Sequence, residues 1–397
     1  MKKKITLLLA AAMMVLLTVA AGCSKTTSAP AGGEKKEGGE IKIGGNFEMS
    51  GGAATFGKSS VNGIQLAFKE INAKGGVLGK QLKLIVADNK SEPGESTVAA
   101  TKLITQDKVV VLLGSVASSD SLAAVPVATD NKVPMISPTS TNPKVTVNPD
   151  TKKVRDYIFR VCFIDPFQGE VAANFVLGTL NKKTAAVFID QKSDYSLGLA
   201  EVFTDVFTKG GGQVLVTEKY VAGDKDFKAT LTRIKGKNPD VIFIPGYYQE
   251  VGLIVKQARE LGINVPVVGG DGWDSADLVK IGTAAALNNT YYVNHVATDD
   301  PAVKTFVENY KKDYGSEPDA LAVLAYDSAY VLAEAIKQAG EVNSEKIRAA
   351  LEKIKDFTTL SGKTTIDPAT HNPIKSAVMI EIKDGKNVYK AKIDPKK

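Results

Sequence analysis

The feature that most constrains the fold is a regular alternation of apolar, strand-like runs with segments of helical period, starting near residue 40. The first strand-like runs are Ile41–Phe47, Leu82–Ala87, Val109–Leu113 and Val133–Ile136. Helical-period segments begin between them near Lys58, Glu92 and Ser119. Strands that alternate with helices predict an α/β fold with a doubly wound parallel sheet.

The same alternation then occurs a second time along the chain. The second set of strand-like runs is Tyr157–Phe163, Thr184–Ile189, Gln213–Thr217, Val241–Ile244, Val265–Val268 and Tyr291–Val293. The body has about 350 residues, more than a single core usually spans, so the repeat predicts two lobes. The last part reads as helices over 302–314, 320–339 and 344–353 and strands over 363–366 and 377–382, and we expect it to return to both lobes.

The N-terminus has the pattern of an export signal. Lys2, Lys3 and Lys4 precede an apolar run from Ile5 to Ala21, which is short for a membrane-spanning helix. The run ends in Ala20-Ala21-Gly22-Cys23, which resembles a bacterial lipobox, although Ala20 stands where that motif prefers leucine. We therefore expect a lipoprotein signal peptide over 1–22 and a lipid on Cys23, with plain secretion as the alternative. Residues 23–39 lack large apolar side chains and are predicted to be a flexible linker.

Composition excludes several classes of function. The formal net charge is +6, half of which comes from the three signal lysines, so nothing indicates a nucleic-acid partner. The two cysteines are Cys23 and Cys162, and lipid on the first leaves no internal disulfide; we expect Cys162 to be a small buried residue. His295 and His371 are far apart and no G-x-S-x-G motif occurs, so we expect no metal, no cofactor and no catalysis.

Hydroxyl side chains gather at the ends of two predicted strands of the first lobe. Val109–Leu113 runs into Gly-Ser-Val-Ala-Ser-Ser, and Val133–Ile136 runs into Ser-Pro-Thr-Ser-Thr. Ligands of open parallel sheets bind beyond the carboxyl ends of the strands. Ser118 or Ser119 stands at the expected N-cap of a helix, whose free N–H groups would stabilise a carboxylate. The candidate anion-binding residues are Ser118, Thr139, Ser140 and Thr141.

The second lobe offers a negative charge at the corresponding place. Val265–Val268 runs into Gly-Gly-Asp-Gly, which sets Asp271 at a strand end, and Tyr195 and Tyr247 also follow strands. An anion site opposite a cation site predicts a zwitterionic ligand such as an α-amino acid, held by charge-assisted bonds. Taken singly, the hydroxyls read as turn and cap residues, Asp271 as the cap of a helix near Ser275, and the tyrosines as rim residues.

In combination these residues resemble the leucine/isoleucine/valine-binding proteins of ABC importers, over most of Glu40–Asp384. The resemblance is carried by Met49–Gly51 with Gly57, Ile71–Gly76, Gly114–Ser118, Pro134–Pro138, Asp190–Tyr195, Gly246-Tyr247 and Tyr326-Asp327. It implies that Ser118, Thr139 and Thr141 hold the ligand carboxylate and that Asp271 holds the ammonium.

The resemblance further implies aromatic contacts from Tyr195, Tyr247 and Phe56. Two positions depart from the family pattern: Asp271 replaces a glutamate, and an aromatic residue near Leu321–Val323 is missing. The implied ligand is a branched-chain or other neutral amino acid, with another small carboxylate or amide as the alternative.

The implied architecture is a type I periplasmic-binding-protein fold, two lobes joined by a hinge of three crossovers. Its expected lobes are 40–157 plus 296–362 and 158–295 plus 363–390. The implied partners are a membrane permease with its ATPase and, through Cys23, the membrane surface, on the extracytoplasmic side. A ligand-sensing module for a receptor is the rival class of function.

One competing motif points elsewhere. Gly52–Ser59 matches the P-loop pattern G-x-x-x-x-G-K-[ST], in which Lys58 and Ser59 would serve a nucleotide and its magnesium. Export from the cytoplasm and the position of this loop beside the expected ligand argue against it. The glycines are then expected to let the backbone approach the ligand. Trp273 is expected either to cover the ligand or simply to pack, and His295 to be structural.

Overall fold

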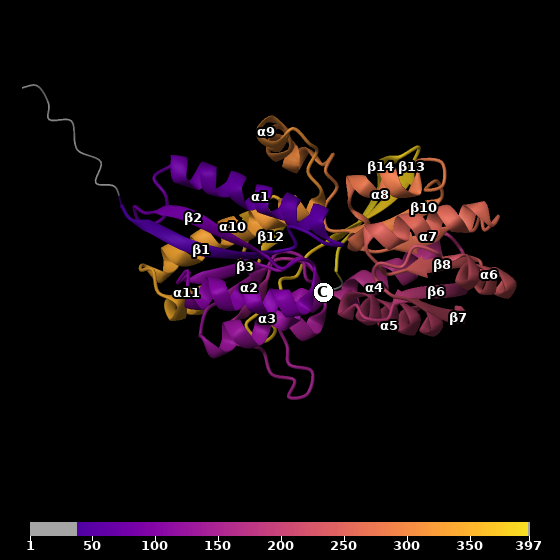
Figure 1. The fold of residues 1–397 in the computed structure, drawn as a ribbon, viewed down its shortest axis with the longest axis horizontal. Coiled ribbons are helices and arrows are strands. Elements are labelled where there is room, and N and C mark those ends of the chain that lie inside the picture. The colour runs from indigo at the N-terminus through magenta and orange to yellow at the C-terminus, as the bar shows by residue number, and fades with distance from the viewer. Residues whose placement is uncertain (1–37, 396–397) are drawn as a thin grey trace, which may run out of the picture. The chain divides into compact units, whose positions relative to one another are not determined.

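The computed structural model describes residues 38–395, the unit shown in colour in Figure 1. The predicted signal peptide 1–22, Cys23 and nearly all of the linker lie outside the described residues. Among the described residues, no helix combines the length and hydropathy needed to cross a membrane. Two large sheets with helices packed against them make up the unit, which confirms the predicted α/β fold class.

The first sheet has five strands, all parallel to their neighbours. In spatial order these strands are β2 (Gln81–Asp88), β1 (Glu40–Phe47), β3 (Val111–Gly114), β4 (Met135–Ser137) and β5 (Ile158–Arg160). The central strand β3 is completely buried, as expected for a parallel sheet covered on both faces. Its helices are α1 (Ala54–Ala73), α2 (Pro93–Thr105), α3 (Ser118–Asp130), α9 (Lys304–Tyr314), α10 (Ala320–Ala339) and α11 (Ser344–Leu351).

The second sheet has seven strands and is parallel except at one end. In spatial order these strands are β14 (Lys386–Ile393), β13 (Ala377–Lys383), β10 (Thr290–Asn294), β9 (Val267–Gly269), β8 (Val241–Ile244), β6 (Thr184–Asp190) and β7 (Gln213–Tyr220). Strands β13 and β14 pair antiparallel and close that edge. Its helices are α4 (Asp165–Asn174), which continues into a π-helical turn over Phe175–Thr179, α5 (Asp194–Lys209), α6 (Lys228–Lys237), α7 (Tyr248–Glu260) and α8 (Ala276–Gly282).

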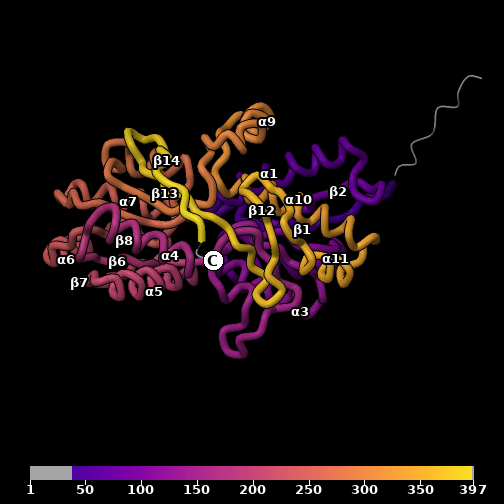
Figure 2. Tube along the Cα trace, turned by 180° about the vertical axis from the view of Figure 1, so that it is seen from behind, coloured from indigo at the N-terminus to yellow at the C-terminus, as the bar shows by residue number. Residues whose placement is uncertain are grey.

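The chain passes between the two sheets three times. It leaves the first sheet after β5, returns after β10, and crosses again after a hairpin of β11 (Phe357–Thr359) and β12 (Gly362–Thr364). Figure 2 shows from behind how the last crossing runs from β12 to β13. Short 3₁₀ helices lie at Pro143–Val145, Asp271–Trp273 and Pro301–Val303. The expected first lobe, 40–157 plus 296–362, holds strands β1 to β4 of the first sheet, whereas β5 falls within the bounds expected for the second lobe.

Two details of the predicted strand order are wrong. The run Tyr157–Phe163 was expected to open the second set, but β5 pairs with β4 in the first sheet, with Met135 opposite Ile158. The run is apolar enough for either sheet, and only tertiary pairing decides between them. Strand β14 was not predicted, because its sequence is rich in lysine, a residue that protects an exposed edge from further pairing.

The loop after β1 does not form a phosphate cradle. Helix α1 begins at Ala54, so Gly57, Lys58 and Ser59 lie inside the helix. Ser59 donates a hydrogen bond to Asp319, the N-cap residue of α10. A Cβ added to Gly57 would lie 2.1 Å from the carbonyl oxygen of Glu48. This glycine therefore lets α1 pack against the backbone after β1, and the expectation that it brings the backbone to a ligand is wrong.

Candidate functional site

A cavity of about 20 Å³ lies between the elements of the two sheets. All the predicted ligand-contacting residues except Ser140 line it. The lining consists of Phe56, Val116, Ser118, Thr139, Thr141, Tyr195, Tyr247, Asp271, Gly272 and Leu321. This volume is far below the roughly 300–1,000 Å³ of pockets for drug-sized ligands, so the surrounding side chains nearly fill the site in this arrangement.

Hydroxyl groups form one end of the cavity. Ser118 Oγ accepts a hydrogen bond from the backbone N–H of Asn142 at 3.2 Å, which leaves its own hydrogen free to donate. Thr141 Oγ1 is buried and meets no hydrogen-bond partner among residues 38–395. Thr139 Oγ1 donates to the carbonyl of Val116 at 3.1 Å and can only accept a further bond. Ser118 and Thr141 are therefore the side chains that can donate to an anion here.

Ser140 has a structural position instead. Its hydroxyl lies 2.6 Å from Ser121 Oγ and donates toward the carbonyls of Ser115 and Val116, and Ser140 is not among the lining residues. Its backbone N–H donates to Ser137 Oγ at 2.9 Å.

The beginning of helix α3 differs from the prediction. The N-cap is Ala117, so neither Ser118 nor Ser119 caps the helix. The N–H groups of Val116 and Ala117 both donate to the buried carboxylate of Glu48, at 3.0–3.2 Å. These two donors stabilise Glu48 and are not free for a ligand. Helical geometry leaves the next N–H groups, from Ser118 onward, without intrahelical partners.

Glu48 forms a buried pair with Asp120 of α3. Burial, together with the neighbouring charge of Glu48, raises the pKa of Asp120 to about 9. Burial also raises the pKa of Glu48. Because Glu48 accepts the two backbone N–H groups, we assign the proton to Asp120, which then donates to Glu48. The pair therefore carries one negative charge at neutral pH.

This pair predicts a pH-dependent stability. An unfolded Asp120 ionises near pH 3.8 and the folded one near pH 9. The stabilisation of the folded state by protonated Asp120 is fully present below the unfolded pKa, and it is lost as the pH rises toward the folded pKa. The free energy of unfolding should thus fall across this window, and less steeply in Asp120→Asn. Urea denaturation at about pH 5 and pH 8 measures it; an unchanged slope in Asp120→Asn, matching the exposed control Asp150→Asn, contradicts the assignment.

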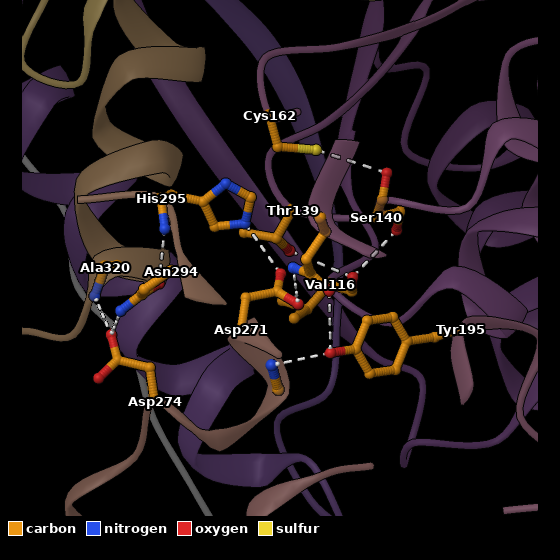
Figure 3. Close-up of polar contacts among 12 residues, drawn as sticks. Val116, Thr139, Ser140, Cys162, Tyr195, Asp271, Asp274, Asn294, His295 and Ala320 are labelled. Atoms are coloured by element: carbon orange, nitrogen blue, oxygen red, sulfur yellow. Dashed lines mark hydrogen bonds and ion pairs between the residues drawn. The ribbon is translucent and has the colours of Figure 1, made fainter. Parts of the chain in front are cut away.

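The acidic end of the cavity is built around Asp271, which lies in the 3₁₀ turn after β9. Its Oδ1 accepts from Gln168 Nε2 at 2.8 Å, and its Oδ2 lies 2.8 Å from His295 Nε2 (Figure 3). Ser275 caps α8, so the reading of Asp271 as that cap is wrong. Sequence reasoning missed Gln168, and treated His295 only as a structural residue, because both act through Asp271.

Aromatic rings form the walls between the two ends. Tyr195 and Tyr247 are stacked, with centroids 5.2 Å apart, and Phe56 meets Tyr247 edge to face at 6.1 Å. Leu321, at the start of α10, lines the place where the family pattern has an aromatic residue. Trp273 is fully buried, donates to the carbonyl of Ile244 and does not line the cavity, so its role is packing.

Arg160 holds the backbone of the segment that carries Thr141 at the hydroxyl end of the cavity. Its side chain is fully buried and donates to the carbonyls of Ser140 and Asn142 and to Thr146 Oγ1. Burial raises the pKa of nearby Asp165 to about 8, an effect that the Thr141 hydroxyl partly offsets, although the two groups do not meet in hydrogen-bond geometry. Cys162 is buried, as predicted, and burial raises its pKa to about 12.

Hydrogen bonds bridge the two sides around the cavity. Ser119 of α3 donates to Asp194 of α5 at 3.1 Å and accepts from its N–H at 3.0 Å. On another side, Thr55 of α1 donates to the hydroxyl of Tyr248 of α7. The cavity is therefore closed over by direct contacts between elements of both sheets. No group of three or more histidine, cysteine or acidic side chains suited to a metal ion occurs within the described chain.

Comparison with known proteins agrees with this geometry. The family description for periplasmic binding proteins matches residues 40–387. The chain is 34% identical over 328 residues to the Leu/Ile/Val-binding protein BraC3 of Rhizobium johnstonii, covering 82% of this chain and 87% of the relative.

Two solved structures are similar throughout. The leucine-binding protein LivK of Thermotoga maritima is 42% identical, with a TM-score of 0.83 and coverage of 89% of this chain and 99% of that one. LivJ of Streptococcus pneumoniae, a branched-chain amino acid transporter substrate-binding protein in complex with isoleucine, is 41% identical, with a TM-score of 0.83 and coverage of 90% and 99%. On these matches, the chain belongs to the periplasmic binding protein family.

Proposed function

We propose that this protein is the extracytoplasmic solute-binding component of an ABC importer, capturing a branched-chain or other neutral amino acid and delivering it to a permease. The relatives are named as binding proteins for leucine, isoleucine and valine or are solved with isoleucine. They are substrate-binding proteins rather than enzymes, and we propose binding without turnover.

The observation that supports this function is the opposition of two chemistries in one cavity. Ser118 and Thr141 present hydroxyl donors at one end, and Asp271 presents a carboxylate at the other. A ligand with a carboxylate and an ammonium can satisfy both ends at once, and only such a ligand contacts residues from both sheets through its charges. Its binding then favours the closed arrangement, which is the form that a permease would recognise.

A calorimetric screen of the twenty amino acids against the purified protein tests the proposal. We expect leucine, isoleucine or valine to bind with micromolar or better affinity, equivalent to about −8 kcal/mol. The cavity walls are apolar apart from the tyrosine hydroxyls, so charged amino acids should bind more weakly. Failure of all neutral amino acids, with binding of another small carboxylate or amide, would replace the proposed ligand.

Thr141→Val separates binding from stability. The Thr141 hydroxyl makes no hydrogen bond to any residue of 38–395, so its removal should leave the free energy of unfolding nearly unchanged. Leucine affinity should fall by about 1 kcal/mol or more, since a hydrogen bond to a charged group is lost. The matched control is Thr146→Val, whose hydroxyl bonds Asn372 and Arg160 away from the cavity and whose loss should lower stability instead. Equal leucine affinity in Thr141→Val and the parent protein removes Thr141 from the site.

We also propose that Cys23 carries a lipid and tethers the protein to the extracytoplasmic face of the membrane. The sequence Ala20–Cys23 and the linker that follows support this. Mass spectrometry of the N-terminal peptide should find a diacylglyceryl modification on Cys23, and an unmodified cysteine refutes the anchor.

A further inference from the structure

The carboxylate of Asp271 is held on both oxygens by the protein itself. Gln168 donates to Oδ1 and His295 lies at hydrogen-bond distance from Oδ2, each at 2.8 Å. Gln168 is fully buried, and the His295 side chain is 2% exposed. Since a carboxylate can only accept, His295 must carry a proton on Nε2 to make this contact favourable. Two such bonds restrict Asp271 to one orientation of its carboxylate plane.

A directional chain of hydrogen bonds fixes Gln168 in turn. The N–H of Gly272 donates to the Tyr195 hydroxyl at 3.3 Å, and that hydroxyl donates to Gln168 Oε1 at 3.4 Å. This series of hydrogen bonds begins at Gly272, the residue next to Asp271, and returns to Asp271 through the Gln168 amide. Each group has one possible sense of donation, so the amide of Gln168 cannot flip without breaking two bonds. The hydrogen of the Tyr195 hydroxyl is thereby used, so this hydroxyl cannot donate to a ligand.

Both residues that hold Asp271 lie next to segments that connect the two sheets. Gln168 lies in the first turn of α4, directly after the passage from β5, and His295 directly follows β10, where the chain returns toward α9. The two segments touch, because the rings of Phe163 and His295 are stacked with centroids 3.7 Å apart. Figure 3 shows the His295 ring reaching Asp271 from the side opposite to Tyr195.

We propose that Gln168 and His295 are positioning residues that preset Asp271 for the ligand ammonium and couple its orientation to two of the three connecting segments. The inference rests on the proposed function for the ligand, but the clamp on Asp271 is a property of the chain alone. With both oxygens already oriented, binding requires little reorganisation of Asp271, and this preorganisation contributes to affinity.

Paired ligands and matched variants test this role in the full-length protein. The probes are leucine and 4-methylpentanoate, which is leucine without its ammonium group. Gln168→Leu removes one donor, and His295→Phe keeps a ring against Phe163 while removing the other donor. The controls are Gln257→Leu and His371→Phe: Gln257 is a buried glutamine that bonds Phe227 and Lys225, and His371 is a buried histidine stacked on Phe159, both outside the cavity lining.

We expect each clamp variant to lose about tenfold or more in leucine affinity, the effect of one hydrogen bond to a charged group, while 4-methylpentanoate affinity changes less than about threefold. His295→Gln, which keeps an amide donor, should recover part of the loss. The controls should bind both probes like the parent protein, even where their melting temperature falls. Equal losses for both probes in the clamp variants would overturn the proposal, because the residues would then act on the fold or on closure.

A ligand-free measurement separates this inference from the proposed function. The chain has two histidines, so subtracting the spectrum of His295→Phe assigns the imidazole ¹⁵N signals of His295. We expect a protonated Nε2 whose signal shifts in Asp271→Ala. An unprotonated Nε2 overturns the clamp whatever the protein binds. A protonated, Asp271-sensitive Nε2 in a protein that binds no amino acid would support the clamp and refute the proposed ligand class.

Discussion

Asp271→Ala is expected to weaken leucine binding by roughly 2 to 5 kcal/mol, or about thirty-fold to several thousand-fold in dissociation constant. Asp271 is the cavity-lining carboxylate at the end opposite Ser118 and Thr141, and the ligand ammonium would lose its charged partner in a closed cavity. Gln168 and His295 would meanwhile retain donors without an acceptor, although they can rebond to a water molecule. Isothermal titration calorimetry measures the change directly.

Two controls accompany this variant. Asp150→Ala removes an exposed carboxylate outside the cavity lining and should leave leucine affinity unchanged. Binding of 4-methylpentanoate should decline far less than binding of leucine in Asp271→Ala, since this probe has no ammonium. Unchanged leucine affinity in Asp271→Ala would exclude Asp271 from the ligand site and, with it, the two-ended model of recognition.

Arg160→Met is expected to lower the free energy of unfolding by about 3 kcal/mol or more, since several buried acceptors lose their donors at once. Arg160 is fully buried and donates to two carbonyls and one hydroxyl. Methionine fills much of the space but supplies no donor. Because Ser140 and Asn142 flank Thr141, the loosened segment should also weaken leucine binding.

Urea denaturation with and without leucine measures both effects. The matched control is Arg233→Met, which removes an exposed ion pair with Glu218 and should change the free energy of unfolding little, because solvent screens the pair. A stability loss in Arg160→Met no larger than in Arg233→Met would show that the acceptors find other partners. A large stability loss with unchanged leucine affinity would confine Arg160 to the fold.

Much of the fold could be predicted because strand and helix periods are local properties. Helix α10 has the predicted bounds, Ala320–Ala339, since its apolar period, the cap Asp319 and the terminal Gly340 all lie within the segment itself. Membership of a sheet is not local. Strand β5 joined the first sheet against prediction, and the lysine-rich β14 carried too few apolar residues to be recognised.

The candidate site divides in the same way. Residues at the carboxyl ends of strands could be inferred from the general rule for open parallel sheets, and Phe56, Ser118, Thr141 and Asp271 do line one cavity. Residues that contact the site only through another residue could not be inferred in this way. Glu48, Gln168 and His295 bond partners that are 68, 103 and 24 positions away in the sequence.

By itself, the sequence determined the α/β class, the repeated strand–helix architecture and the kinds of side chain at the strand ends. Each of these follows from the hydrophobic period of a short segment or from the residues that end it. Only the tertiary structure decided which of those polar groups are free. It assigned the N–H groups of Val116 and Ala117 to Glu48, bonded the Ser140 hydroxyl to a main-chain carbonyl, used the hydrogen of the Tyr195 hydroxyl and clamped Asp271. The physical reason is that a buried polar group must find a partner, and that partner is chosen by distance in space, which the order of residues does not encode locally.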